Sequence, residues 1–276
     1  MSHLRLFARD ELVLALRSRW TQIFAVVFGL LACGVSGAGY VLSGGHGVQD
    51  FARTAVSLVQ LVLLLVPLTA LMIGVLSLAP ERGAAELVFS QPVARRTILL
   101  GKLLGLFQAL AAAQAVGFGL AGALVYGQSG SEGLGGFLLL VAASLVTTAI
   151  FLGLAALLSA GAVGRRRTRA LALALVVWFV AVVLFDLAAL GTASLLPSGL
   201  ASRVLMVSVI ANPVGAVRTG ALLGIEGTGA FGAASLALFR FTRGAGGVGV
   251  VLGLSLLFWL VVPTTLAVRR LQRADV

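Results

Sequence analysis

Long apolar runs alternate with shorter polar segments over the whole chain. A bilayer core of about 30 Å is crossed by roughly 20 apolar residues in a helix, and lipid leaves a single chain segment no other partner for its backbone. The pattern therefore predicts an all-α polytopic membrane protein with six transmembrane helices. We place them at Thr21–Leu42, Ala55–Ala79, Leu103–Tyr126, Leu134–Ala160, Ala170–Leu195 and Gly247–Val268.

The first twenty residues carry a helical pattern of their own. Their apolar side chains share one arc at helical spacing, namely Leu4, Phe7, Ala8, Leu12 and Ala15. Glu11 interrupts that arc, and Leu6 and Val13 lie opposite to it. We favour an interfacial helix over residues 1–20, lying along the membrane surface. A plain flexible leader is the alternative.

Basic residues collect in alternate gaps between the apolar runs. Fifteen of the 20 Lys and Arg residues lie in the N-terminal segment, the second gap, the fourth gap and the C-terminal tail. The other five are Arg53, Arg203, Arg218, Arg240 and Arg243. Positive charge is retained on the cytoplasmic side during insertion. The split predicts a multi-pass protein of the cell inner membrane with both termini in the cytoplasm.

Composition supports the membrane assignment. Apolar residues make up 60% of the chain and charged residues 11%, with a mean hydropathy of +1.11, whereas soluble domains average about 25% charged residues. The net charge of +11 does not indicate nucleic acid, because the basic residues border apolar runs and form no continuous face. It indicates attraction to anionic membrane lipid. We detect no internal repeat, so residues 1–276 are expected to form a single transmembrane domain.

Residues 80–102, PERGAAELVFSQPVARRTILLGK, form the richest polar segment and are too many for a simple turn between helices. The charged residues are Glu81, Arg82, Glu86, Arg95, Arg96 and Lys102. They flank a short apolar group, Leu87–Phe89, and Pro92 interrupts any continuous helix. We favour a short cytoplasmic helix that docks on a soluble partner. The alternative is a solvated loop whose arginines only set the topology.

Residues 197–246 form the longest gap, and the charge split places it outside. The segment is apolar enough to lie against the membrane or to re-enter it, with short helices expected at Leu200–Ile210 and Pro213–Leu223. Asn212 followed by Pro213 is typical of a helix start, since Asn caps the helix and Pro fits its first position.

Catalytic chemistry finds little support in the chain. An ATP-binding loop needs Gly-Lys followed by Ser or Thr, but the only lysine is Lys102 and Leu103 follows it. A membrane serine protease would lack its base, because His3 and His46 lie outside the predicted spans. One Cys, two His and three Met are too few for a relay of soft metal ligands. We expect no catalytic, cofactor or metal site here.

Asp186 is the only acidic residue well inside a predicted span. A charge in hydrocarbon is expensive, so such a residue normally faces a partner or a cavity. One hypothesis is a substrate- or proton-sensitive group. The other, which we favour, is that Asp186 lies near the outer end of the fifth span and hydrogen-bonds a neighbouring helix.

The polar loop and the topology together resemble the type-2 family of ABC transporter permeases. The family's loop has an acidic residue and a glycine, then a proline, one or two arginines and a final Gly-Lys. The same order occurs here in Glu81, Gly83, Pro92, Arg95, Arg96 and Gly101-Lys102. The resemblance implies that a separate cytoplasmic ATPase binds ATP and Mg²⁺ and contacts this loop. The residues concerned are Glu81, Gly83, Glu86, Leu87, Phe89, Pro92, Arg95, Arg96 and Lys102. The short GRRRTR segment after the fourth span departs from the family pattern.

Two further stretches resemble the permeases that serve maturation of nitrous oxide reductase. They are Leu171–Leu190 in the fifth span and Ala211–Gly229 in the segment before the last span. The resemblance implies a homodimer with two ATPase copies, in a system that supports assembly of a copper–sulfur cluster. It also implies a periplasmic accessory partner resting on the 197–246 segment, where the candidate contacts are Asn212, Pro213, Arg218 and Glu226.

We therefore expect a permease that couples ATP hydrolysis by its partner to transport or mechanical signalling. The alternative is a stand-alone membrane assembly factor or ion pathway without ATP. Such transporters show internal repeats, broken helices or intramembrane charges, and only Asp186 fits that description.

Overall fold

The computed structural model describes residues 3–42, 48–79, 93–129, 134–160, 167–227, 233–242 and 244–273, and every regular element among them is a helix. Six helical segments are long and apolar enough to cross a membrane. They are α2 (Arg19–Leu42), α3 (Val48–Leu78), α5 (Arg95–Ser129), α6 (Leu134–Ser159), the segment from α7 to α8 (Arg167–Ser194) and α12 (Ala245–Arg273). Their order and places match the six predicted spans, so the all-α membrane fold is confirmed.

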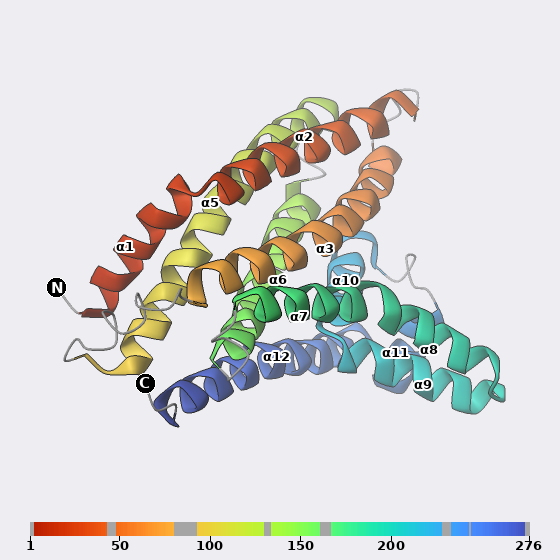
Figure 1. Cartoon of the computed structure of the whole chain (residues 1–276). Helices are drawn as coiled ribbons and strands as arrows, with labels where there is room; N and C mark the ends of the chain where they lie inside the picture. The colour runs from red at the N-terminus through yellow and green to blue at the C-terminus, as the bar shows by residue number, and fades with distance from the viewer. Residues whose placement is uncertain are drawn as a thin grey trace.

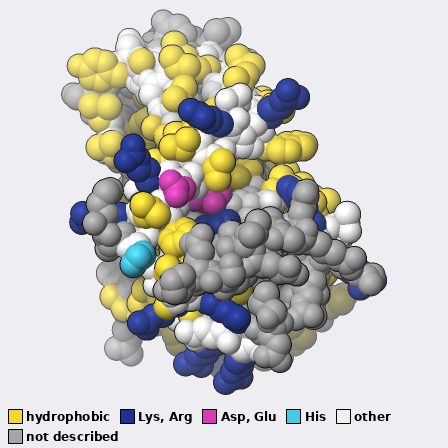
Figure 2. Space-filling model, turned by 60° about the vertical axis from the view of Figure 1, so that its left-hand side comes forward, with side chains coloured by type: hydrophobic (Ala, Val, Ile, Leu, Met, Phe, Trp, Pro, Cys, Tyr) yellow, Lys and Arg dark blue, Asp and Glu magenta, His cyan; other side chains and the backbone are white. Residues whose placement is uncertain are grey.

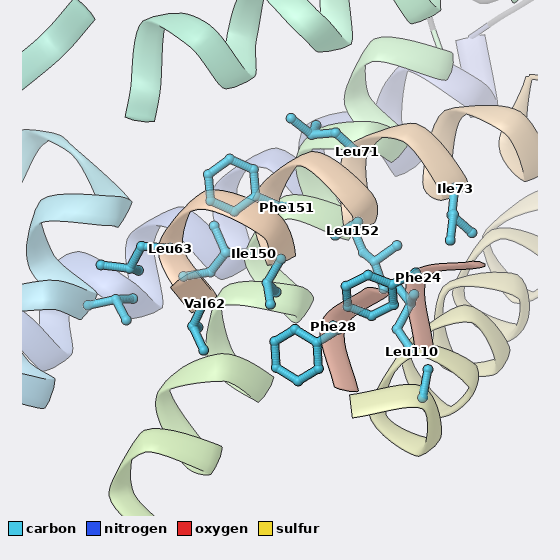
Figure 3. Close-up of a cluster of buried hydrophobic side chains, with 14 of the residues drawn as sticks. Phe24, Phe28, Val62, Leu63, Leu71, Ile73, Leu110, Ile150, Phe151 and Leu152 are labelled. Atoms are coloured by element: carbon cyan, nitrogen blue, oxygen red, sulfur yellow. The ribbon is translucent and has the colours of Figure 1, made fainter. Parts of the chain in front are cut away.

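The core lies where α2, α3, α5 and α6 meet (Figure 3). Phe28 of α2 and Phe151 of α6 are fully buried there. Edge-to-face ring contacts join Phe28 to Phe118 of α5, with centroids 5.0 Å apart, and Phe118 to Phe137 of α6, at 5.8 Å. Such pairs contribute beyond their buried area, so the aromatic chain ties three spans together.

Small residues in α5 bring neighbouring helices close, as membrane helix interfaces require. A Cβ on Gly117 would meet the Phe28 ring at 2.6 Å, and one on Gly122 would meet the Phe137 ring at 2.8 Å. A Cβ on Gly119 would meet nothing within 4 Å. Two of these three glycines are therefore packing positions, and Gly119 faces open space.

Helix α5 begins earlier than the sequence pattern suggests. The predicted span starts at Leu103, whereas α5 starts at Arg95 and runs for 35 residues. At 1.5 Å per residue that is about 52 Å, well beyond a hydrocarbon core of about 30 Å. The last part of the polar 80–102 segment is thus the first two turns of a long helix.

The N-terminal segment forms a helix, α1 (His3–Arg17), and not a flexible leader. Figure 1 shows α1 and α2 following one another almost in line, with the first part of α5 beside α1. The start of α5 and both described ends of the chain lie at the same end of the molecule (Figure 1). We call it the basic end, after Arg95, Arg96 and the arginines at the end of α12.

The opposite end holds the irregular part of the structure. The fifth span is interrupted, because α7 (Arg167–Phe179) passes through η1 (Val180–Leu184), one turn of π-helix, before α8 (Phe185–Ser194). The two short helices expected after it are present as α9 (Ser198–Ala211) and α10 (Pro213–Glu226). They are bent by 97° at Asn212 and together pass as a broken span or re-entrant pair. A further helix, α11 (Ala233–Thr242), precedes α12.

Candidate functional site

Helices α1 and α5 touch at the basic end through two glycines. A Cβ on Gly105 would lie 2.4 Å from the carbonyl oxygen of Ala8 and 2.8 Å from Glu11 Cβ. A Cβ on Gly101 would lie 2.7 Å from Phe7 Cβ. Real side chains do not approach this closely, so only glycine at both positions allows this packing. The apolar arc predicted from the leader is the face that α1 turns to α5, with Ala8 and Ala15 each 5% exposed.

Glu11 is the buried polar centre of this contact. It is only 5% exposed, and its Oε2 lies 3.3 Å from Nζ of Lys102 on α5. Its Oε1 accepts a hydrogen bond from Ser77 Oγ in the last turn of α3. A buried carboxylate needs such partners. One side chain thereby joins α1, α3 and α5, and we call Glu11, Ser77, Gly101, Lys102 and Gly105 the junction.

The junction explains why an acidic residue, Glu11, lies within the apolar arc of the N-terminal helix. Glu11 interrupts the apolar arc because it is directed at the only lysine of the chain. The signal was present in the sequence as a lone acidic residue within an apolar face. The identity of its partners depends on tertiary packing between residues 66 and 91 positions apart, which no local pattern reveals.

Arg95 and Arg96 lie at the start of α5 but have different surroundings. Arg95 Nη1 donates a hydrogen bond of 3.1 Å to the carbonyl oxygen of Leu271, in the last turn of α12. A cation at that position satisfies a terminal carbonyl and interacts favourably with the helix dipole. Arg96 is exposed. Of the two arginines predicted to meet an ATPase, Arg95 is thus already bonded within the chain and Arg96 is the accessible one.

The rest of the predicted coupling segment lies outside the described residues. This holds for Glu81, Gly83, Glu86, Leu87, Phe89 and Pro92. Their contact with a partner stays a prediction. What the structure adds is where the segment is attached, since Ala79 follows the last turn of α3 and Arg95 begins α5.

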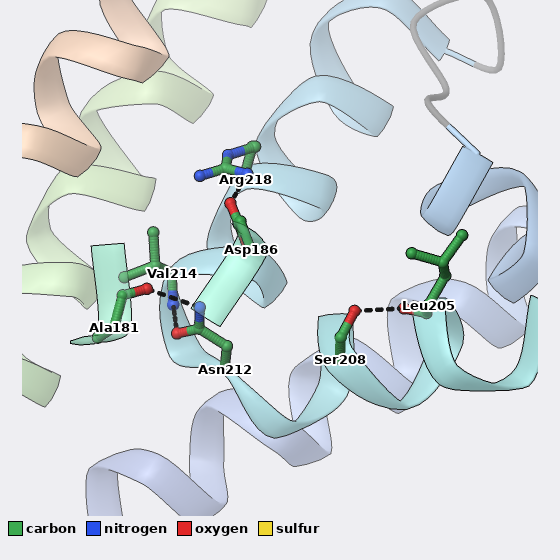
Figure 4. A network of polar contacts seen from close by, with 7 residues as sticks. All are labelled: Ala181, Asp186, Leu205, Ser208, Asn212, Val214 and Arg218. Atoms are coloured by element: carbon green, nitrogen blue, oxygen red, sulfur yellow. Dashed lines mark hydrogen bonds and ion pairs between the residues drawn. The ribbon is translucent and has the colours of Figure 1, made fainter. Parts of the chain in front are cut away.

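A second polar group surrounds the irregular backbone of the opposite end (Figure 4). Asp186, in the first turn of α8, pairs with Arg218 of α10 at 2.5 Å. The two side chains are 33% and 26% exposed. This is a contact with a neighbouring helix, as our structural hypothesis for Asp186 predicts. Arg218 directs its guanidinium to Asp186, and its expected contact with an exterior partner stays a prediction.

Asn212 holds the bend between α9 and α10. Its Oδ1 accepts a hydrogen bond of 3.1 Å from the backbone N–H of Val214, and Pro213 occupies the first position of α10. The predicted helix start is therefore confirmed. Its Nδ2 donates at 2.7 Å to the carbonyl oxygen of Ala181, inside the π turn η1. We call Ala181, Asp186, Asn212 and Arg218 the 181–218 cluster.

Asn212 and Glu226 are two of the four residues expected to contact an exterior partner. Asn212 is 2% exposed and uses both polar atoms of its side chain within the chain. The structure thus gives it a role in positioning the bend, and its contact with an exterior partner stays a prediction. Glu226 ends α10, its side chain lies outside the described part, and its contact stays a prediction.

A third polar group, missed by the sequence analysis, lies between α5 and α6. Gln114 Nε2 donates to Thr148 Oγ1 at 2.7 Å, and Ser144 Oγ donates to Gln114 Oε1 at 2.6 Å. All three side chains are at most 2% exposed. Their mutual satisfaction marks them as a bond between helices, of the kind that polar residues make inside membranes.

Known proteins resemble this chain over nearly its whole length. A family model described as "ABC-2 family transporter protein" matches residues 6–276. A protein of Pseudomonas aeruginosa named "Probable ABC transporter permease protein NosY" is 35% identical over 236 residues, which cover 83% of this chain and 85% of the relative. A protein of Stutzerimonas stutzeri with the same name is 34% identical over 267 residues, covering 94% of each chain.

Proposed function

Because this chain belongs to the ABC-2 family of transporter proteins, we propose that, as a permease subunit, it converts ATP-driven closure of its ATPase partner into rearrangement of its own helices. The observation that carries the proposal is the junction. A force applied to the segment between α3 and α5 reaches Ser77, at the end of α3, and Lys102, near the start of α5. Both bond to Glu11 of α1, so the three helices respond together.

Helix α5 is long enough to connect the junction with the core of the membrane helices. The helix is continuous from Arg95 to Ser129, and proline-free throughout. It carries the junction at one end and the Gln114 hydrogen bonds to α6 further along. Packed helices move as units because close-packed interfaces resist gradual deformation. A displacement at the basic end is passed along α5 into the core.

The basic end faces the cytoplasm in this proposal, and the membrane is the inner membrane. The charge split of the sequence supports the orientation, with 15 of 20 basic residues in the gaps on that side. Because the number of spans is even, both described ends of the chain lie at the same end of the molecule (Figure 1). A soluble ATPase then meets the polar segment that follows α3.

Maturation of nitrous oxide reductase is the process that we assign to the system. The resemblance of Leu171–Leu190 and Ala211–Gly229 to such permeases and the similarity to two proteins named NosY support it. The assembly would contain two copies of this chain, two ATPase copies and an accessory protein on the 197–246 segment. The cargo would be a sulfur-containing species, or motion alone passed to the accessory protein.

The rival is a stand-alone assembly factor or ion pathway. A broken helix is indeed present at Asn212, and transporters of that kind use one. Asp186, however, is neutralised by Arg218 and has no second unpaired acidic residue beside it among the described spans. One ion pair alone does not provide a pathway for ions or protons.

Co-purification separates the two readings. Tagged chain is extracted from native membranes in mild detergent, and the recovered ATPase is quantified. Burial contributes about 1.5–3 kcal/mol for each large apolar side chain before ordering costs, so the double change Leu87→Ala/Phe89→Ala should abolish ATPase recovery. The matched control Leu195→Ala/Leu200→Ala alters two exposed leucines at the opposite end and should leave it intact. Wild-type chain without any ATPase, under conditions that preserve its own assembly, would favour the rival.

A further inference from the structure

A cavity of about 300 Å³ opens at the basic end, beside the junction. Four parts of the chain enclose it: the elbow between α1 and α2, the end of α3, the start of α5 and the start of α7. Its lining includes Glu11, Ser18, Trp20, Ser77, Lys102 and Arg167. Neither the junction contacts nor the ATPase coupling proposed above gives this space a role.

The lining is cationic and has hydrogen-bond donors. Lys102 and Arg167 are its basic residues, and Glu11, which bonds Lys102 and Ser77, is its acidic residue. The elbow adds Arg17 and Arg19, which flank the lining residue Ser18 and are both exposed. In Figure 2 the left-hand side of Figure 1 comes forward, and Lys and Arg side chains, in dark blue, are spread over this face. Four basic side chains in or beside the lining, Arg17, Arg19, Lys102 and Arg167, favour an anionic ligand.

The cavity lies at the ends of candidate membrane spans. Its residues come from the first turn of α2, the last turns of α3 and the first residue of α7, which are the ends of three membrane spans. Trp20 lines it and is 60% exposed, and tryptophan prefers the headgroup level of a membrane. A ligand here sits at the boundary between water and hydrocarbon.

Exposed apolar side chains follow the cavity residues along two of the spans that border it. On α2, below Trp20, the exposed side chains are Ile23, Val27 and Leu30, at 54%, 41% and 69%. On α7, beyond Arg167, Leu173 and Val176 are 39% and 55% exposed. Acyl chains of a lipid whose headgroup occupied the cavity would lie along these faces. A soluble anion makes no use of them.

We propose that this cavity binds the phosphate-bearing headgroup of an anionic phospholipid, with Lys102 and Arg167 as its cationic contacts. Basic pockets between membrane helices on the cytoplasmic side are typical headgroup sites. The volume suits a glycerophosphate headgroup, which leaves the acyl chains outside the cavity. The site shares Glu11, Ser77 and Lys102 with the junction, but lipid binding is measured without the ATPase, so its failure and that of the proposed function are distinguishable. A lipid bound here would press on the helices that the junction joins.

Native mass spectrometry of the purified chain tests the proposal. The chain is titrated with dioleoyl phosphatidylglycerol and, in parallel, with zwitterionic dioleoyl phosphatidylcholine. We expect phosphatidylglycerol to occupy the first site more strongly. Arg167→Gln should weaken it about fivefold, as expected for loss of one basic residue near an anionic headgroup. Arg169→Gln is the matched control, because Arg169 is exposed on the same helix two residues later and outside the lining; it should leave the affinity unchanged.

A third variant guards against loss through misfolding. Glu11→Gln releases Lys102 from its carboxylate and should increase phosphatidylglycerol occupancy, which a damaged fold would not do. Equal losses in Arg167→Gln and Arg169→Gln would show non-specific charge attraction and overturn the proposal. So would equal binding of the two lipids. Displacement of phosphatidylglycerol by inorganic phosphate at comparable concentration would identify a soluble-anion site and also overturn it.

Discussion

The junction and the 181–218 cluster each contain an ion pair, yet their surroundings differ. In the junction the Glu11 and Lys102 side chains are 6% and 27% exposed, and regular helices are pressed together at Gly101 and Gly105. In the cluster the Asp186 and Arg218 side chains are 33% and 26% exposed. There the backbone is irregular, with a π turn in the fifth span and a 97° bend after α9.

The difference indicates which end is able to change shape. At Gly101 and Gly105 no free space remains between α1 and α5, and close-packed interfaces are not continuously deformable. A π turn and a broken helix satisfy their backbone groups through side chains such as Asn212, and such sites are common at functional positions. We infer that the junction moves as one body and that the 181–218 cluster rearranges.

The largest effect is expected from breaking the helix contact of the junction. Gly105→Leu places a side chain against the backbone oxygen of Ala8, 2.4 Å from its Cβ position, and a backbone atom cannot rotate away. Overpacking of this kind typically costs about 1–3 kcal/mol of stability. We expect a loss of about 3 kcal/mol or more here, because the clash is with backbone. The thermal unfolding temperature in detergent should fall sharply, and ATPase stimulation in the complex should be lost.

Gly119→Leu is the control for this change. Gly119 lies on the same helix with nothing within 4 Å of its Cβ position. The variant should therefore keep the thermal unfolding temperature and the ATPase stimulation of the wild-type chain. If Gly105→Leu were equally harmless, α1 would not be held against α5 as described.

A smaller effect is expected when the junction loses its carboxylate. Glu11→Ala leaves Lys102 and Ser77 without their shared partner. Removing one member of a buried ion pair costs about 3–5 kcal/mol, but Lys102 is 27% exposed and its long side chain reaches toward the interface. We expect about 1–3 kcal/mol, measured as loss of thermal stability. Asp10→Ala removes an exposed acid next to it and should be neutral; the same loss in both variants would argue against a specific role for Glu11.

The pair in the 181–218 cluster should matter less for stability. Because both of its side chains are about a third or a quarter exposed, Asp186→Asn should cost about 1 kcal/mol or less. A double-mutant cycle with Arg218→Gln measures the coupling. Arg203→Gln, an exposed arginine on α9, is the charge-matched control. Transport or signalling should change more than stability, and an unaltered activity in Asp186→Asn would leave the pair with a structural role alone.

The smallest effects should separate the two neighbouring arginines. Arg95→Ala removes a hydrogen bond to the end of α12, which is worth about 0.3–1 kcal/mol near a helix terminus. Arg96→Ala should leave stability unchanged and slow association of the ATPase, since exposed charges act mainly on rate. Surface-plasmon resonance of the two variants measures the rate. Equal effects of both changes on stability and association would contradict the assignment.

The sequence predicted the fold well because its signals are local. The six spans, the apolar arc of α1 and the start of α10 at Asn212-Pro213 follow from hydropathy and capping within a few residues, and the structure confirms each of them. The start of α5 was placed eight residues late, because Arg95, Arg96 and Lys102 interrupt the hydropathy and yet do not interrupt the helix.

The site was predicted less completely for a physical reason. The partner of Glu11, the use of Gly101 and Gly105 as contacts for α1, and the pairing of Asp186 with Arg218 all arise when distant helices pack. The π turn at Val180–Leu184 has no local signal, since the stretch is uniformly apolar. In the structure the Asn212 side-chain amide donates a hydrogen bond to the carbonyl oxygen of Ala181 in this turn.

The most direct test of the account compares the two ends during ATP-driven closure. In a Cys33→Ala background, spin labels at Arg9→Cys and Leu100→Cys report on α1 against α5, and labels at Leu138→Cys and Val207→Cys report on α6 against α9. The distances between the spin labels are measured by double electron–electron resonance in the reconstituted complex, without nucleotide and after trapping with ATP and vanadate. We predict an unchanged distance for the first pair and a shifted one for the second. A first pair that shifts while the second stays fixed would contradict the account.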